Sequence, residues 1–180
     1  MKIYTRDGDD GTTGLYFGGR VAKDSLQIEL NGAVDEAQAS LGWARSLVVT
    51  GSRLDEALIA VERDLWVLMA EVATAPQNRT KLVAGKTLVT PEMVTALERS
   101  IDELSAETVM PSEFVVPGQS QVSAALDVAR TVVRRAERLA VVAAASGSQI
   151  VPYLNRLSDL VWSMARWSEG DNHLTARSGN

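Results

Sequence analysis

The residues best placed to do chemistry in this chain are regularly spaced arginines. Arg130, Arg134 and Arg138 recur at intervals of four, with Glu137 beside the last of them. At about 3.6 residues per turn, they fall on one stripe of a helix, opposite valines, alanines and a leucine. Such arginines repel one another slightly, so the stripe needs a stabilising partner. Two interpretations remain open: a solvated surface screened by Glu137 and Asp127, or a clamp for a polyanion, since guanidinium groups bind phosphate in forked pairs.

The overall composition excludes several classes of protein. There are 18 basic and 23 acidic residues, a net charge of −5, so no general field attracts nucleic acid or an anionic membrane. The absence of cysteine excludes disulfides, thiolate metal sites and a cysteine nucleophile. His173 is the single histidine, which excludes a histidine metal cluster and a serine triad.

Length and apolar content favour one domain. The 180 residues, 46% of them hydrophobic, suffice for one substantial core. The first residues lack an apolar signal core, and no apolar run approaches the roughly 20 residues that span a bilayer. We expect a cytoplasmic protein with neither nucleic acid nor membrane as a partner.

The amino-terminal segment 1–23 is rich in glycine. Five glycines lie between positions 8 and 19, so we expect an irregular loop and neither helix nor regular strand. Its backbone N–H groups could cradle phosphates, although it lacks the Walker spacing and an entry loop without ligand fits equally well. Three aspartates would oppose phosphate, so Mg²⁺ or the basic residues Arg6, Arg20 and Lys23 would have to offset them.

Hydrophobic periodicity predicts five helices. Their expected ranges are about 24–48, 53–74, 91–104, 121–145 and 150–168, with residues 77–89 as a connecting loop. We therefore expect an all-α five-helix bundle forming a single domain over residues 1–170, followed by a disordered tail at 171–180.

Several residues outside the arginine stripe have both a functional and an ordinary interpretation. The last helix should present a polar face with Asn155, Asp159, Trp162 and Arg166, of which the first two could bind an arginine or hydrated Mg²⁺. Phe114 lies between two prolines, in a segment that should be extended. The ordinary interpretation of the helix residues is a polar, solvated face, and a phenylalanine such as Phe114 is most often a core residue.

Four motifs in sequence order are similar to those of the PduO-type ATP:cob(I)alamin adenosyltransferases, and the resemblance spans nearly the whole chain. They are Lys2-Ile-Tyr-Thr-Arg-Asp-Gly-Asp-Asp-Gly-Thr-Thr, Gly18-Gly-Arg-Val-Ala-Lys-Asp, Val34-Asp-Glu, and Ala129-Arg-Thr-Val-Val-Arg-Arg-Ala-Glu-Arg with Tyr153-Leu-Asn-Arg-Leu-Ser-Asp.

The resemblance implies a homotrimer of five-helix bundles with active sites between subunits. It implies that Asp35 pairs across the interface with Arg130, that Phe114 crowds the lower face of the corrin, and that Trp162 lies near the same cofactor. The implied ATP-binding residues are Thr5, Arg6, Asp7, Gly8, Thr13, Gly14, Lys23, Arg134, Arg135, Glu137, Arg138 and Asn155. The implied catalytic set is Arg130, Arg134, Asp35 and Phe114.

The implied reaction is adenosyl transfer. Co(I) of cob(I)alamin attacks the ribose 5′ carbon of ATP, triphosphate leaves, and adenosylcobalamin forms. This needs positioning and charge on the leaving group, but no protein acid, base or nucleophile. Mg²⁺ would travel on the ATP phosphates rather than in a metal site of the protein. A flavoprotein reductase and an adenosylcobalamin-dependent acceptor enzyme are the implied protein partners.

The chain departs from the family pattern at a few positions. Family members often have histidine where Asp127 stands, and Val115-Val-Pro-Gly-Gln replaces the commoner Ile-Leu-Pro-Gly-Gly. The alternative function is a helical cofactor carrier or ATP sensor that kept the nucleotide site without turnover.

Overall fold

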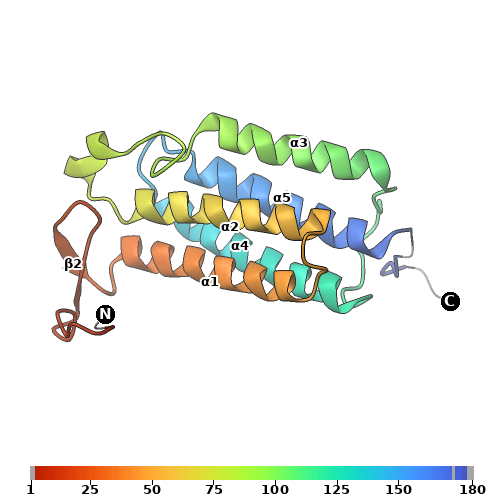
Figure 1. Ribbon diagram of the computed structural model, residues 1–180, viewed down its shortest axis with the longest axis horizontal. Helices are drawn as coiled ribbons and strands as arrows, with labels where there is room; N and C mark the ends of the chain where they lie inside the picture. The colour runs from red at the N-terminus through yellow and green to blue at the C-terminus, as the bar shows by residue number, and fades with distance from the viewer. Residues whose placement is uncertain (1–2, 172, 178–180) are drawn as a thin grey trace.

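The computed structural model describes residues 3–171 and 173–177, and it is built around five long helices. They are α1 (Leu26–Ser46), α2 (Arg53–Val72), α3 (Pro91–Glu107), α4 (Gln121–Ala143) and α5 (Ile150–Glu169). They run alongside one another in an elongated bundle (Figure 1). α1 packs against α2 and α4, and α5 packs against α4 and α3. The predicted five-helix bundle is confirmed.

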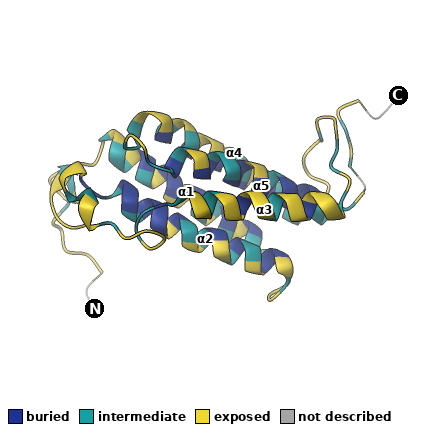
Figure 2. Cartoon of the chain, turned by 90° about the horizontal axis from the view of Figure 1, so that it is seen from above, coloured by how far each residue is buried: buried dark blue, intermediate teal, exposed yellow. Residues whose placement is uncertain are grey.

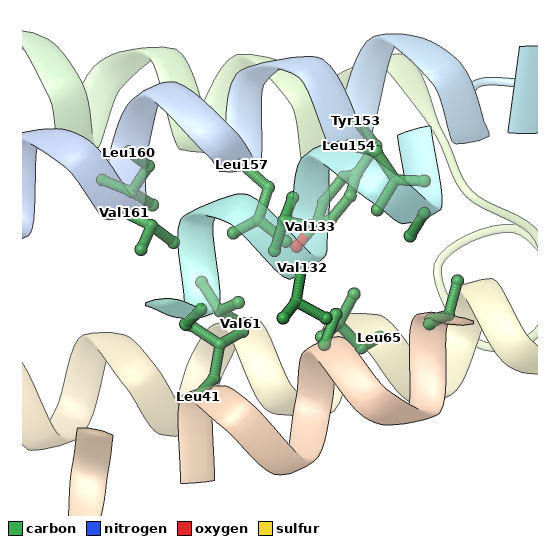
Figure 3. Packing of buried hydrophobic residues seen from close by; sticks show 14 of the residues in the cluster. Leu41, Val61, Leu65, Val132, Val133, Tyr153, Leu154, Leu157, Leu160 and Val161 are labelled. Atoms are coloured by element: carbon green, nitrogen blue, oxygen red, sulfur yellow. The ribbon is translucent and has the colours of Figure 1, made fainter. Parts of the chain in front are cut away.

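The core is formed by the apolar stripes of these helices. Figure 3 shows Leu41, Leu65, Val133 and Leu157 among the buried side chains that fill the space between helices. Leu41, Leu65, Val133 and Leu157 are all 0% exposed. Burying such side chains away from water is the main favourable term for the bundle. Among the described helices, none is long and apolar enough to cross a bilayer.

Local signals in the sequence start the helices. Ser52 accepts a hydrogen bond from the Asp55 N–H at the start of α2, and Thr90 does the same for Met93 ahead of Pro91 at the start of α3. At the start of α4, Ser120 and Ser123 form a reciprocal capping box. These caps satisfy backbone donors that have no partner within the helix.

The amino-terminal segment is more regular than predicted. We expected no strand, but β1 (Thr12–Gly14) and β2 (Arg20–Ala22) form an antiparallel hairpin. Gly18 and Gly19 adopt φ of 95° and 97°, which lets the chain reverse, and the Leu15 N–H bonds the Gly19 carbonyl at 2.9 Å. The glycines that argued against a strand therefore build its turn. The hairpin lies beyond the end of the bundle where α1 begins (Figure 1).

The segment after α2 also differs from the predicted loop, because Pro76–Lys81 forms a 3₁₀ helix, η1. Glu71 of α2, only 1% exposed, fixes this region. Its carboxylate accepts hydrogen bonds from Arg79, Ser148 and the backbone N–H of Val89 at 2.6–2.8 Å. One buried carboxylate therefore ties the α2–α3 and α4–α5 connections to α2, and the three donors offset its desolvation.

The chain beyond α5 turns back onto the Phe114 segment. The Val116 N–H bonds the Leu174 carbonyl at 2.7 Å, and the Ala176 N–H bonds the Phe114 carbonyl at 2.8 Å. Gly170, with φ of 66°, provides the turn that ends α5. Residues 172 and 178–180 of the expected disordered tail, like residues 1–2, lie outside the described residues.

Candidate functional site

α4 carries both faces that its sequence predicts. Ala129, Val133 and Ala136 are 0% exposed, whereas Arg134 and Arg138 are exposed. Figure 2 shows that α4 carries both buried and exposed residues. Arg130 is intermediate, with 28% of its side chain exposed. From Arg130 to Arg138 the helix rises by about 12 Å, so the arginines form a ladder along one side of the bundle.

Glu137 joins the upper part of this ladder to α5. Its Oε1 accepts a 2.8 Å hydrogen bond from Nδ2 of Asn155, and the Arg138 guanidinium donates to the Arg134 carbonyl at 3.0 Å. Arg156 donates to the Asn155 side-chain oxygen, so the amide is held from both sides. The structure thus brings together Glu137 and Asn155, which lie 18 residues apart in the sequence.

Arg135 points to a different neighbour. It forms an ion pair with Glu36 of α1, which links the two helices on the side away from Asn155. Asp35, the residue before Glu36, is exposed on α1. Its predicted pairing with Arg130 of another subunit concerns a second chain and stays a prediction.

The amino-terminal loop folds around Lys23 and Arg20. A Cβ added to Gly8 would lie 3.0 Å from the Lys23 ammonium and 3.1 Å from the Thr12 carbonyl, so the absence of a side chain allows this approach. Arg20 donates to the Asp7 carbonyl and, at 2.9 Å, to Thr12 Oγ1. Arg20 also lies 3.6 Å from Asp10 Oδ1, so one of the loop acids is partly offset by a base of the same segment.

The remaining predicted loop residues are on the outside of the hairpin. Thr5, Arg6 and Gly14 are exposed, and Arg6 adopts φ of 69°, a value that L residues rarely take. Thr13 lies in β1, opposite Val21. The Tyr16 N–H anchors the hairpin to the Ala73 carbonyl beyond α2 at 2.9 Å. Within one chain, these contacts direct the hairpin toward α2.

The loop acid Asp10 is held in its ionised form. The Thr12 backbone N–H, followed by the Thr12 hydroxyl, holds the pKa of Asp10 below its ordinary value. Within residues 3–171 and 173–177, no three acidic or histidine side chains come close enough together to hold a metal ion.

A second group of predicted residues meets at a cavity of about 540 Å³. Phe114, Arg130 and Trp162 line it, from the α3–α4 connection, α4 and α5 respectively. Phe114 is 90% exposed, so it is not the core residue of the ordinary interpretation. The other lining residues are Ser112, Glu113, Val115, Pro117, Asp127, Arg166, Ala176 and Arg177.

Two residues at this cavity differ from the sequence interpretation. Asp127 was a candidate surface acid, but it is 5% exposed, and Arg166, expected on a polar helix face, is 1% exposed. Arg166 donates to Asp127 at 2.7 Å and to Glu169 at 3.0 Å. The solvated-surface interpretation is therefore wrong for the Asp127 end of α4.

Sequence reasoning could have found part of this group. Asp127 and Arg130 are three residues apart on one helix, which indicates an ion pair. Nothing in the local pattern joins Asp127 to Arg166, which lies 39 residues later. The contribution of Ala176 and Arg177 to the cavity likewise depends on the return of the chain after α5.

Known proteins resemble this chain over most of its length. The family model described as cobalamin adenosyltransferase matches residues 3–168. A corrinoid adenosyltransferase of Citrobacter freundii is 40% identical over 174 residues, covering 93% of this chain and 95% of its own. One from Mycobacterium tuberculosis is 38% identical over 183 residues, covering 99% and 94%.

Solved structures resemble the chain as well. A variant PduO-type ATP:corrinoid adenosyltransferase from Lactobacillus reuteri, complexed with cobalamin and ATP, superposes with a TM-score of 0.85 at 27% identity over 98% of this chain and 97% of its own. Another variant, complexed with ATP, gives 0.79 at 28% identity over 93% and 94%. The chain therefore belongs to the cobalamin adenosyltransferase family.

Proposed function

We propose that this chain transfers the 5′-deoxyadenosyl group of ATP to the cobalt of cob(I)alamin, releasing triphosphate, through residues of the α4 ladder and the cavity beside it. The observation that carries this proposal is the position of Arg130. It lines the cavity with Phe114 and Trp162, and it stands one helical turn before Arg134. A corrin-sized ligand and a polyphosphate can thus approach adjacent parts of one helix.

On the nucleotide side, Arg134 and Arg138 would bind the triphosphate as it leaves. Both guanidinium groups are on an exposed part of α4, and their charge stabilises negative charge that grows in the transition state. Glu137 and Asn155 would orient the nucleoside, since they form a fixed pair of acceptor and donor groups. On the phosphates, the loop Thr5–Gly14 would close together with Lys23. Arg135 would lie behind the arginine ladder of α4.

On the corrinoid side, Phe114 would press an apolar ring against the lower face of the corrin. Its side chain is exposed at the cavity and contributes little to the core, so core packing does not prevent it from contacting a ligand. By excluding water and a lower ligand from cobalt, it would ease reduction to Co(I). Trp162 would contribute a second aromatic wall.

We also propose that the complete site forms between subunits of a homotrimer. The hairpin is anchored to α2, while the arginine ladder faces outward on α4, so a neighbouring chain can join the two halves. Asp35 is exposed and free of core packing, as an intersubunit partner of Arg130 requires. Light scattering should give three chains per particle, and Asp35→Ala should weaken both assembly and corrinoid binding.

Magnesium would enter with the nucleotide. Mg²⁺ prefers phosphate oxygens and water with few carboxylates, so ATP can bring it without a dedicated protein cage. A flavoprotein reductase would supply Co(I), and an adenosylcobalamin-dependent enzyme would receive the product. We propose that the protein acts in the cytoplasm.

The deciding experiment follows the corrin spectrum after mixing the protein with ATP, Mg²⁺ and chemically reduced cobalamin. Formation of a light-sensitive Co–C bond with release of triphosphate supports the proposal. Binding of both ligands without that bond would favour the carrier or sensor. Omitting ATP provides the control for spectral change caused by binding alone.

A further inference from the structure

Four charged side chains are linked beside the Phe114 cavity, and three of them, Asp127, Arg130 and Arg166, line it. Asp127 lies between two guanidinium groups: its Oδ1 is 3.4 Å from Nε of Arg130, and its Oδ2 accepts the 2.7 Å hydrogen bond from Arg166. Arg166 also contacts Glu169 at 3.0 Å. Two carboxylates thus face two guanidinium groups, and their charges balance only when Arg130 is included.

Arg166 is the fixed member of this cluster. It is 1% exposed, donates to both carboxylates, and lies 6.0 Å from the centre of the Trp162 ring. A buried charge is tolerated only when it is well paired, so Arg166 and Asp127 hold each other in place. Glu169 is further held by Nδ1 of His173 at 3.0 Å. The carboxylate of Asp127 therefore has a fixed position.

The two contacts of Asp127 are unequal. The one to Arg166 is short and buried, whereas the one to Arg130 is longer and reaches a partly exposed side chain. Asp127 contacts Nε of Arg130, which leaves the two terminal nitrogen atoms of that guanidinium outside the pair. Among the described residues, Asp127 is the acidic partner of Arg130. The carboxylate can therefore orient Arg130 and still leave the two terminal nitrogen atoms of Arg130 to bind a ligand.

We propose that Asp127 is a positioning residue for Arg130: anchored by Arg166, it holds the Arg130 guanidinium at the cavity wall in the orientation that meets the corrinoid. The inference rests on the proposed function, because it assumes that this cavity takes the corrinoid. Asp127 acts through Arg130 and does not itself touch the reacting atoms.

A double-mutant cycle tests this inference. Asp127→Asn keeps the side-chain volume and removes the charge, so the KM for the corrinoid should rise about tenfold, as for loss of a hydrogen bond between charged groups. The KM for ATP should stay within about twofold, because the nucleotide residues lie further along α4. Asp127→Glu should restore much of the loss. In the background of Arg130→Gln, adding Asp127→Asn should change the corrinoid KM little.

Asp55→Asn provides the matched control for stability. Asp55 is also 5% exposed and pairs with Arg45 at 2.8 Å, but between α1 and α2 and away from the cavity. It should lower the melting temperature without changing the corrinoid KM. Three results would overturn the inference. In the double variant, the rise in corrinoid KM could equal the product of the rises in the two single variants. In Asp127→Asn, the KM for ATP could rise as much as the KM for the corrinoid, or the corrinoid KM of the active variant could be unchanged. An inactive native chain would instead reject the proposed function.

Discussion

Asn155 Nδ2 lies 2.8 Å from Glu137 Oε1, and this hydrogen bond connects the start of α5 to the arginine ladder of α4. Glu137 stands between Arg134 and Arg138 in the sequence, so it would compete with phosphate if its carboxylate were free to bind them. The amide gives the carboxylate another partner. The contact therefore keeps the arginines available for an anionic ligand.

Replacing Asn155 should impair nucleotide binding. Asn155→Ala removes the donor to Glu137, and we expect the KM for ATP to rise about tenfold. Asn155→Asp should be worse, because it places a second carboxylate beside Glu137. Steady-state ATP titrations at saturating corrinoid measure both effects. Equal ATP KM values for the native chain and the aspartate variant would contradict this role.

Arg134→Ala should abolish turnover without unfolding the protein. The side chain is exposed, so its loss costs little packing, but it removes a charge proposed to stabilise the departing triphosphate. We expect kcat to fall by about 100-fold or more, as when one stabilising donor is removed from a transition state. Arg99→Ala, on the exposed side of α3, is the control. A fully active Arg134→Ala would remove this residue from the site.

Phe114→Ala distinguishes a role of this side chain at the cavity from a role in the core. Because the side chain is 90% exposed, the free energy of unfolding should change by no more than about 0.5 kcal/mol. Turnover should nevertheless fall most strongly when the assay begins from Co(II), since cobalt reduction is the step that the ring assists. Urea unfolding and parallel assays from Co(II) and chemically prepared Co(I) measure the difference. An equal loss from both starting states would argue against a role in reduction.

The pH dependence of stability should contain a contribution from Asp64. Burial raises the pKa of Asp64 above its ordinary value, and the 2.9 Å hydrogen bond from Tyr153 only partly offsets this. As the pH rises above that ordinary value, the unfolded chain loses the proton first. The folded state therefore loses stability until the pH passes the higher folded-state pKa.

Asp64→Asn removes this titration but keeps an oxygen for Tyr153. The unfolding free energy of the native chain relative to the variant should fall as the pH rises above about 4, until the pH passes the raised pKa of Asp64 in the folded state. Urea unfolding at several pH values measures it. A constant difference across that range would show that Asp64 titrates alike in both states.

The long helices could be predicted from the sequence because their signals are local. The last helix was expected over 150–168 and spans Ile150–Glu169, since regularly spaced leucines mark its buried face and Gly170 ends it. The hairpin was missed because three-residue strands are too short to show alternation. Its register, Thr12 opposite Ala22, depends on a turn between the strands.

Only part of the candidate site could be predicted from the sequence. Glu137 and Asn155 could be identified because their motifs resemble those of a family, but their contact is a tertiary one. The burial of Arg166 could not be predicted, because a stripe shared with Trp162 can face water or a neighbouring helix. Arg166 is buried because it meets Asp127 on α4, and helical periodicity does not specify which residues of two helices meet.

The pairing of Leu174 and Ala176 with the Phe114 segment limits how the protein can be handled. A purification tag or fusion joined just after this segment would pull on the part of the chain that lines the cavity, and one at the amino end would disturb the glycine-rich segment. The turn at Gly85 is exposed, and the Gly85 N–H bonds the Leu88 carbonyl at 2.9 Å. An inserted epitope or fluorescent label should be tolerated there.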